Sequence, residues 1–180
     1  DDALLKALAD HVIARHYPEA AKAEDPYMAL LEAVVARQAV LIARWMSVGF
    51  IHGVMNTDNC SIAGETIDYG PCAFMEQFDP QKVYSSIDQG GRYAYNRQPQ
   101  VGFENCRYLA TALLPVMEED DVRRGLRRYE VAYNERFLQN MRDKLGLIIE
   151  DEADLSLIMD TYSMLHEHGI DYTRFFRGLS

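Results

Sequence analysis

Residues 50–75 gather side chains that could bind a metal ion and accept a proton. This stretch holds one histidine, two aspartates, two asparagines and a glutamate, set between apolar residues and glycines. Asp58 and Asn59 are adjacent, and Asp68 stands directly before Tyr69-Gly70. Carboxylate and amide oxygens are ligands that Mg²⁺ accepts, and two of them suffice when phosphates and water supply the rest. The stretch therefore predicts a Mg²⁺ site that works together with a bound phosphate compound.

A tight hairpin is expected to bring the two metal ligands together. Residues 60–63 and 66–67 are typical of two short strands, and Gly64-Glu65 between them suits a turn. This hairpin would fold Asp68 back towards Asn59, nine residues earlier in the chain. The sequence thus predicts a short β-hairpin that carries the metal-site residues.

Helices are predicted for most of the remaining chain, because apolar residues recur there at spacings of three and four. The expected helices cover residues 3–15, 26–48, 103–117, 121–145 and 153–167, and a further helical segment follows Asp171. Residues 84–99, rich in glycine, tyrosine and polar residues, are expected to form an ordered loop over the site. The predicted fold class is therefore mainly α.

The helix at residues 26–48 is predicted to be the central core helix. Asp25-Pro26 provides an N-cap followed by proline in the first turn, and Gly49 ends the helix. Arg37, Gln38 and Arg44 are interpreted as exposed polar residues rather than as side chains that point into a site. The predicted buried face comprises Met28, Leu31, Val34, Val35, Leu41, Ile42, Trp45 and Met46. The predicted inward face of the helix at 153–167 comprises Leu155, Ile158, Met159, Tyr162 and Leu165.

Length and composition favour a single domain that spans residues 1–180. The chain is 48% hydrophobic, which is enough to bury a sizeable core at this length. No apolar run approaches the roughly 20 residues that span a bilayer, so no membrane association is expected. The cysteines Cys60, Cys72 and Cys106 are odd in number and lack C-x-x-C spacing, which indicates reduced thiols in a cytosol-like compartment.

The charge of the chain argues against nucleic acid as a partner. The formal net charge is −10, whereas binding to a phosphate backbone relies on lysine and arginine. One basic cluster is present, at Arg123, Arg124, Arg127 and Arg128. It follows the acidic residues 118–121 so closely that a salt-bridged, solvated helix face is expected.

The candidate ligands match the metal positions of protein-kinase-like phosphotransferases. Those enzymes hold Mg²⁺ with a catalytic-loop asparagine and the aspartate of a D-F-G motif, while another loop aspartate attends to the acceptor hydroxyl. Asn59 and Asp68-Tyr69-Gly70 match the two metal positions. Two residues after His52, where that other aspartate is expected, stands Val54, and the loop carboxylate is Asp58 instead. These residues therefore do not by themselves imply ordinary γ-phosphoryl transfer.

Several longer runs of the chain resemble one known protein family. They are residues 52–59, 64–75, 85–88 and 91–95, and residues 15–18 and 171–177 fit the same pattern. These runs are similar to the selenoprotein O family, also called the YdiU family. The resemblance implies a protein-kinase-like fold, of which this chain would be the helical C-lobe. It also implies protein AMPylation, in which ATP binds reversed in the cleft and AMP passes to Ser, Thr or Tyr hydroxyls of other proteins.

The resemblance implies a role for each candidate residue. Asp58 corresponds to the proton acceptor, Asn59 to a Mg²⁺ ligand, and Asp68 to a ligand shared by the metal and ATP. Mn²⁺ is the alternative metal. His52 is expected to hold the loop in shape rather than to react. The implied partners are ATP and protein substrates, in the bacterial cytoplasm or, for a eukaryotic member, in the mitochondrion.

Parts of the family pattern do not occur in this chain. It has no glycine-rich phosphate loop, no strand lysine with a helix glutamate partner, and no arginine cluster before the central stretch. We therefore expect a C-lobe portion of a larger enzyme that does not transfer AMP on its own. Two alternatives stay open. Asn59 and Asp68 would also serve a kinase-like phosphotransferase, and Val54 is compatible with a non-catalytic pseudokinase module that binds partners.

Overall fold

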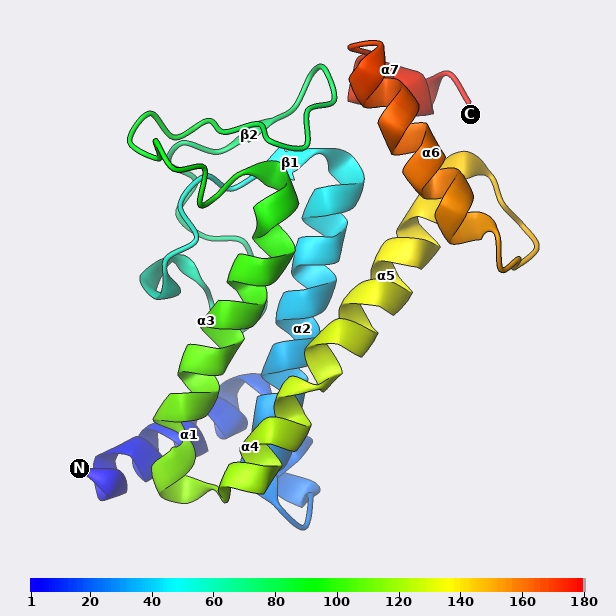
Figure 1. Cartoon of the computed structure of the whole chain (residues 1–180). Helices are drawn as coiled ribbons and strands as arrows, with labels where there is room; N and C mark the ends of the chain where they lie inside the picture. The colour runs from blue at the N-terminus through cyan, green and yellow to red at the C-terminus, as the bar shows by residue number, and fades with distance from the viewer. Residues whose placement is uncertain (180) are drawn as a thin grey trace.

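The computed structural model describes residues 1–179 and is mostly helical (Figure 1). The α-helices are α1 (Asp2–His16), α2 (Pro26–Val48), α3 (Gln98–Ala112), α4 (Glu119–Leu126), α5 (Arg128–Leu145), α6 (Asp154–Glu167) and α7 (Tyr172–Arg177). The short 3₁₀ helices are η1 (Ala20–Lys22), η2 (Thr57–Asn59), η3 (Tyr95–Arg97) and η4 (Leu114–Val116). The strands β1 (Phe50–Ile51) and β2 (Ala73–Phe74) form one small antiparallel sheet. The expectation of a mainly helical fold is confirmed, while the kinase-like C-lobe and the single domain stay predictions.

Helix α2 is the centre of the structure, as the sequence predicts. It contacts α3, α4 and α5, which flank it in Figure 1. The Asp25 carboxylate accepts hydrogen bonds from the N–H groups of Tyr27 and Met28, and Gly49 ends the helix in the left-handed conformation with φ 69°. Capping at both ends and burial along the helix fix the position at which α2 ends and residues 50–75 begin.

The length of α2 corrects one expectation from the sequence. Among the described residues, α2 is the one helix that is long and apolar enough to cross a membrane, judged by length and composition alone. The apolar run is therefore longer than expected. Its packing against three other helices in the main hydrophobic cluster accounts for this character without a membrane.

The predicted hairpin at residues 60–67 is wrong in its extent. The two segments share a single β-bridge, between Cys60 and Thr66, and the regular strand pair is instead β1 with β2. The reason is that other donors occupy the backbone carbonyls of this segment. The Ser61 oxygen accepts from Gln38 Nε2 at 2.6 Å, and the Ile62 oxygen accepts from the Tyr17 hydroxyl at 2.5 Å. The candidate metal ligands therefore lie on η2 and in an irregular loop that the β1–β2 pair closes.

Two helix predictions need smaller corrections. Helix α3 begins at Gln98 rather than at residue 103, since Pro99 suits the first turn of a helix. The helix expected at 121–145 is two helices, α4 and α5, with a turn at Arg127. Gly125 lies so close to Leu31 that an added Cβ would be 2.9 Å from its Cδ2 atom, so close packing on α2 decides the course of α4.

The buried face of α6 is narrower than predicted. Ile158 and Leu165 are fully buried, whereas Leu155 and Met159 are 54% and 52% exposed. The periodicity of the apolar residues predicts that this segment is a helix, but it does not predict how wide a face of the helix the neighbouring elements bury.

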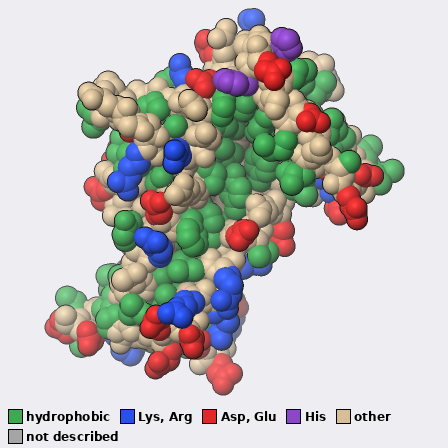
Figure 2. Space-filling model, viewed as in Figure 1, with side chains coloured by type: hydrophobic (Ala, Val, Ile, Leu, Met, Phe, Trp, Pro, Cys, Tyr) green, Lys and Arg blue, Asp and Glu red, His purple; other side chains and the backbone are tan. Residues whose placement is uncertain are grey.

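The basic cluster at residues 123–128 forms the expected solvated face. Arg123 pairs with Glu119, and Arg124 lies 2.9 Å from Asp121. Figure 2 shows acidic and basic side chains interspersed at the end of the molecule that α1 and α4 form. This end therefore presents mixed charge rather than a basic surface.

Candidate functional site

Asp58 and Asn59 lie together on η2, which follows the Phe50–Ile51 strand after a short loop. Asn59 is half-buried, and its Nδ2 atom donates a hydrogen bond of 3.0 Å to the Val54 oxygen. This bond fixes the orientation of the amide and leaves its oxygen available as a ligand. Asp58 is exposed, and within residues 1–179 its carboxylate takes part in no hydrogen bond or ion pair. The carboxylate is therefore free to accept a proton from a neighbouring molecule.

Asp68 occupies an unusual backbone conformation at the other end of the loop. Its φ of 56° makes it the one non-glycine residue with positive φ in the described part of the chain. Aspartate tolerates this left-handed region better than most residues, but the conformation still needs support from its surroundings. The N–H of Gly70 donates a hydrogen bond of 2.9 Å to the backbone carbonyl oxygen of Asp68, which tightens the turn. The Asp68 side chain is exposed and, among residues 1–179, has no hydrogen-bond or ion-pair partner.

His52 links the two ends of the loop. The side chain is 1% exposed, and its Nε2 atom lies 2.8 Å from the oxygen of Ile67, the residue before Asp68. Its Nδ1 atom accepts from the Val54 N–H at 3.4 Å, so the proton is on Nε2, which donates to Ile67. Val54 is also the residue that orients Asn59. One hydrogen-bonded frame therefore holds both candidate metal ligands, and His52 has the structural role expected for it.

Trp45 supports this frame from α2. Its indole ring lies 5.4 Å from the His52 ring, measured between centroids. The indole Nε1 atom donates to the Thr66 hydroxyl at 2.9 Å. A residue that the sequence assigns to the core thus also binds the side chain of Thr66, two residues before Asp68.

Three amide side chains from the helices hold the backbone of the loop. Gln98 accepts from the His52 N–H at 2.9 Å and donates to the Phe50 oxygen at 2.9 Å. Asn105 donates from Nδ2 to the Met55 oxygen at 2.9 Å and lies 3.0 Å from Cys60 Sγ. Together with Gln38, which binds the Ser61 oxygen, they pair backbone groups that have no strand partner.

Sequence reasoning missed this role of the amides. Gln98 and Asn105 received no interpretation, and Gln38 was expected to be exposed, whereas it is buried. A signal for Gln38 is present in the sequence, because it lies four residues from both Val34 and Ile42 on the apolar stripe of α2. An uncharged amide on such a stripe indicates a buried hydrogen-bond donor rather than a solvated side chain.

The loop predicted at residues 84–99 contacts the segment that carries Asp58. Asp88 accepts from the N–H groups of Arg92 and Tyr93 at 2.9 and 2.8 Å, which fixes the turn at residues 88–93. The Tyr93 hydroxyl in turn donates to the Asn56 side-chain oxygen, two residues before Asp58. This contact ties the loop to the segment that carries Asp58.

The oxygen ligands fit Mg²⁺ that takes part of its coordination from a nucleotide. Within residues 1–179 no group of three or more His, Cys, Asp or Glu side chains forms a metal site. Asn59 and Asp68 offer one amide oxygen and one carboxylate, both hard ligands. Such a pair is too small for a metal cage of protein ligands alone, and it suits an ion that also binds phosphates and water.

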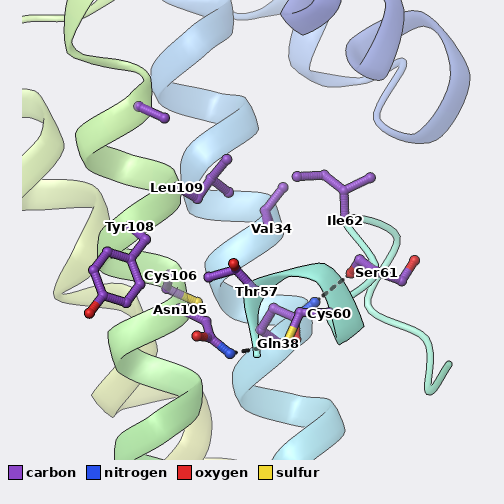
Figure 3. A pocket seen from close by; sticks show the side chains of 11 residues that line it. Val34, Gln38, Thr57, Cys60, Ser61, Ile62, Asn105, Cys106, Tyr108 and Leu109 are labelled. Atoms are coloured by element: carbon purple, nitrogen blue, oxygen red, sulfur yellow. Dashed lines mark hydrogen bonds between the residues drawn. The ribbon is translucent and has the colours of Figure 1, made fainter. Parts of the chain in front are cut away.

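A pocket of about 350 Å³ lies beside η2, between α2, α3 and residues 57–62 (Figure 3). Thr57 and Cys60 line it, and these two residues flank Asp58 and Asn59 in the chain. Burial raises the pKa of the Cys60 thiol, and burial raises the pKa of Cys106 to about 12. Both thiols are therefore neutral near pH 7, which agrees with a packing role rather than a nucleophilic one.

The sequence matches the family described as protein adenylyltransferase SelO over residues 1–180. The chain belongs to this family. The SelO family assignment agrees with similarity to curated proteins named "Protein nucleotidyltransferase YdiU". The protein of this name from Rhodopseudomonas palustris strain BisB18 is 51% identical over 182 residues, covering 98% of this chain and 37% of the relative.

Two further SelO-family relatives of the same name come from other bacteria. The Agrobacterium fabrum protein is 49% identical over 186 residues, covering 100% of this chain and 38% of the relative. The Halalkalibacterium halodurans protein is 51% identical over 183 residues, covering 98% and 37%. The chain thus spans less than two fifths of the length of these relatives, and it contains the loop with Asp58, Asn59 and Asp68.

Proposed function

We propose that the full-length protein carrying this chain transfers AMP from ATP to Ser, Thr or Tyr hydroxyls of other proteins, in a Mg²⁺-dependent reaction. The observation that carries the proposal is the set of hydrogen bonds that holds the loop around His52. His52 and Val54 connect Asn59 to the residue before Asp68, and all three candidate side chains keep unpaired oxygens. Membership of the SelO family and the names of its relatives support nucleotidyl transfer as the reaction class.

The chemistry assigns one step to Asp58. The oxygen of the acceptor hydroxyl forms a bond to the α-phosphorus of ATP, and the bond from that phosphorus to the oxygen bridging to the β-phosphate breaks. Pyrophosphate leaves with the electron pair of this bond. The proton of the hydroxyl passes to the Asp58 carboxylate, whose exposure and lack of a partner leave it accessible.

Asn59 and Asp68 would hold the metal ion on the phosphates. When bound, Mg²⁺ supplies positive charge that offsets the negative charge of the phosphates and of the leaving pyrophosphate. The part of this chain is to present the Asn59 oxygen and the Asp68 carboxylate at fixed positions. The hydrogen bond from Asn59 to Val54 and the bond from His52 to Ile67 serve that purpose.

Labelled ATP tests the proposal in the full-length protein with a mixture of candidate protein substrates and Mg²⁺. Label at the α-phosphate is expected to enter protein, and label at the γ-phosphate is not. Asp58→Asn should lower the rate by about 10²- to 10⁴-fold, the usual contribution of a general base. Ser156→Ala, at an exposed position of α6, is the matched control and should keep the full rate.

The same experiment separates the alternatives. Entry of γ-label without α-label would establish a kinase and contradict adenylyl transfer. Mg²⁺-dependent binding of ATP with neither label in protein would establish a non-catalytic nucleotide-binding module.

A further inference from the structure

We propose that the pocket between α2, α3 and residues 57–62 binds an apolar side chain of the protein substrate, close in sequence to the hydroxyl that accepts AMP. This inference rests on the proposed function and assigns a specificity site to it. Figure 3 shows the pocket wall formed by Val34 of α2, by Tyr108 and Leu109 of α3, and by Thr57, Cys60 and Ile62 of the loop.

The position of the pocket links it to the acceptor site. Thr57, the first residue of η2, and Cys60, its C-cap, line the pocket, and Asp58 lies between them in the chain. An extended peptide advances about 3.3–3.6 Å per residue. A substrate segment with its hydroxyl at the exposed Asp58 therefore keeps residues one to three positions away within about 11 Å of it, which is the reach that the proposal requires.

The wall of the pocket selects an apolar occupant rather than a charged one. The amide nitrogens in the wall are engaged with the loop, because Gln38 donates to the Ser61 backbone oxygen and Asn105 donates to the Met55 backbone oxygen. The surface left for a ligand comes mainly from aliphatic side chains and the Tyr108 ring.

The mouth of the pocket is open to a partner. Tyr108 is 51% exposed, and Thr57 and Ala112 are also exposed, whereas Val34 and Cys106 at the base are buried. Tyrosine at such a rim is frequent in protein interfaces, because it offers a large contact area with little loss of side-chain entropy. An exposed rim over an apolar base suits insertion of one side chain from an extended segment.

A peptide series tests the proposal with the full-length protein, Mg²⁺ and ATP labelled at the α-phosphate. Each peptide carries one serine, and leucine replaces alanine in turn at the three positions before and the three positions after it. Leucine at one position is expected to raise kcat/KM by about 10- to 100-fold over the all-alanine peptide, the range found for small apolar groups that fill a pocket. A series without any preference above about twofold would overturn the proposal.

Two variants locate the preference. Ala112→Phe places a ring in the mouth of the pocket and is expected to reduce the leucine preference to about unity. Thr111→Phe adds the same ring at the neighbouring exposed position, outside the lining, and should keep the preference. Tyr108→Ala removes part of the rim and should lower the preference to an intermediate value. Retention of the full preference in Ala112→Phe would contradict the assignment.

The remaining outcomes distinguish this inference from the proposed function. A protein that adenylates all peptides equally lacks the specificity site but keeps the activity. A protein that labels no peptide and no protein lacks the activity itself. A melting temperature that falls by several degrees in Ala112→Phe but not in Thr111→Phe would show that the protein fills the pocket with its own chain, and would overturn the inference.

Discussion

Two aspartates of this chain, Asp68 and Asp154, have opposite surroundings. Asp154 is 6% exposed, and its Oδ2 atom lies 2.9 Å from Arg142 Nε, in an ion pair that lacks the angle of a hydrogen bond. The same oxygen accepts from the Asp151 N–H, and Arg142 also lies 2.8 Å from Glu150. Asp68 is exposed, has positive φ and has no side-chain partner among residues 1–179.

The difference separates a structural carboxylate, Asp154, from a candidate functional one, Asp68. A buried charge needs its partner, and Arg142 and Asp154 accordingly join α5 to the start of α6. At Asp68 the rigidity comes from the backbone frame around His52, which leaves the carboxylate unsatisfied. The hydrogen bonds that hold this loop therefore leave the Asp68 carboxylate available to a ligand.

The largest effect on stability is expected at Arg142. Arg142→Met leaves Asp154 buried without its counter-ion, which should lower the free energy of unfolding by about 3–5 kcal/mol. Urea denaturation followed by circular dichroism measures the change. The double variant Arg142→Met with Asp154→Asn removes the unpaired charge and should recover part of the loss. A loss below about 1 kcal/mol in the single variant would show that the pair is not structural.

The converse is expected at Asp68. Asp68→Asn should reduce incorporation of α-label into protein by at least about 10²-fold, as for removal of a group that stabilises developing charge. The free energy of unfolding should stay within about 0.5 kcal/mol of the parent value, since the side chain is exposed and unpaired. Full activity of this variant would contradict the role of Asp68 as a ligand of metal and ATP.

Asn105 is expected to have an intermediate effect, because it supports the loop backbone and takes no part in the proposed transfer of the proton or the binding of the metal. Asn105→Ala removes the bond to the Met55 oxygen and should cost about 1–3 kcal/mol of stability, the penalty for a buried unpaired acceptor. We also expect kcat to fall while KM for ATP changes little, because the substitution should displace η2 and leave Asp68, the proposed ligand of ATP, in place. Gln100→Ala, an exposed amide on α3, is the control. Equal changes in kcat and KM would argue for general unfolding of the site.

The smallest effect is expected from the backbone at Asp68. Asp68→Val should destabilise the protein by about 1–2 kcal/mol, because a β-branched residue does not fit φ 56°. Asp68→Gly should leave stability within about 0.5 kcal/mol, since glycine adopts this conformation freely. Both variants are expected to be inactive. Thermal unfolding of the two variants measures the stability cost of the backbone conformation, because both variants lack the carboxylate and differ only in how well they adopt positive φ.

Much of the helical fold could be predicted from the sequence. The bounds of α2 follow from local signals, namely the Asp25 cap, Pro26 and Gly49, and the structure reproduces all three. The hairpin at 60–67 could not be predicted correctly, because its carbonyls bind Gln38 and Tyr17, which are distant in the chain. Apolar alternation in a short segment does not reveal such competing donors.

The sequence by itself determined the family, the helical class and the three candidate residues Asp58, Asn59 and Asp68, because long motifs and local capping signals encode them. Only the tertiary structure decided how the loop is held. His52 reaches Ile67, and amides from α2 and α3 reach the loop backbone, through contacts between segments far apart in the chain. Hydrogen bonds of this kind depend on packing in three dimensions, so no local pattern specifies them.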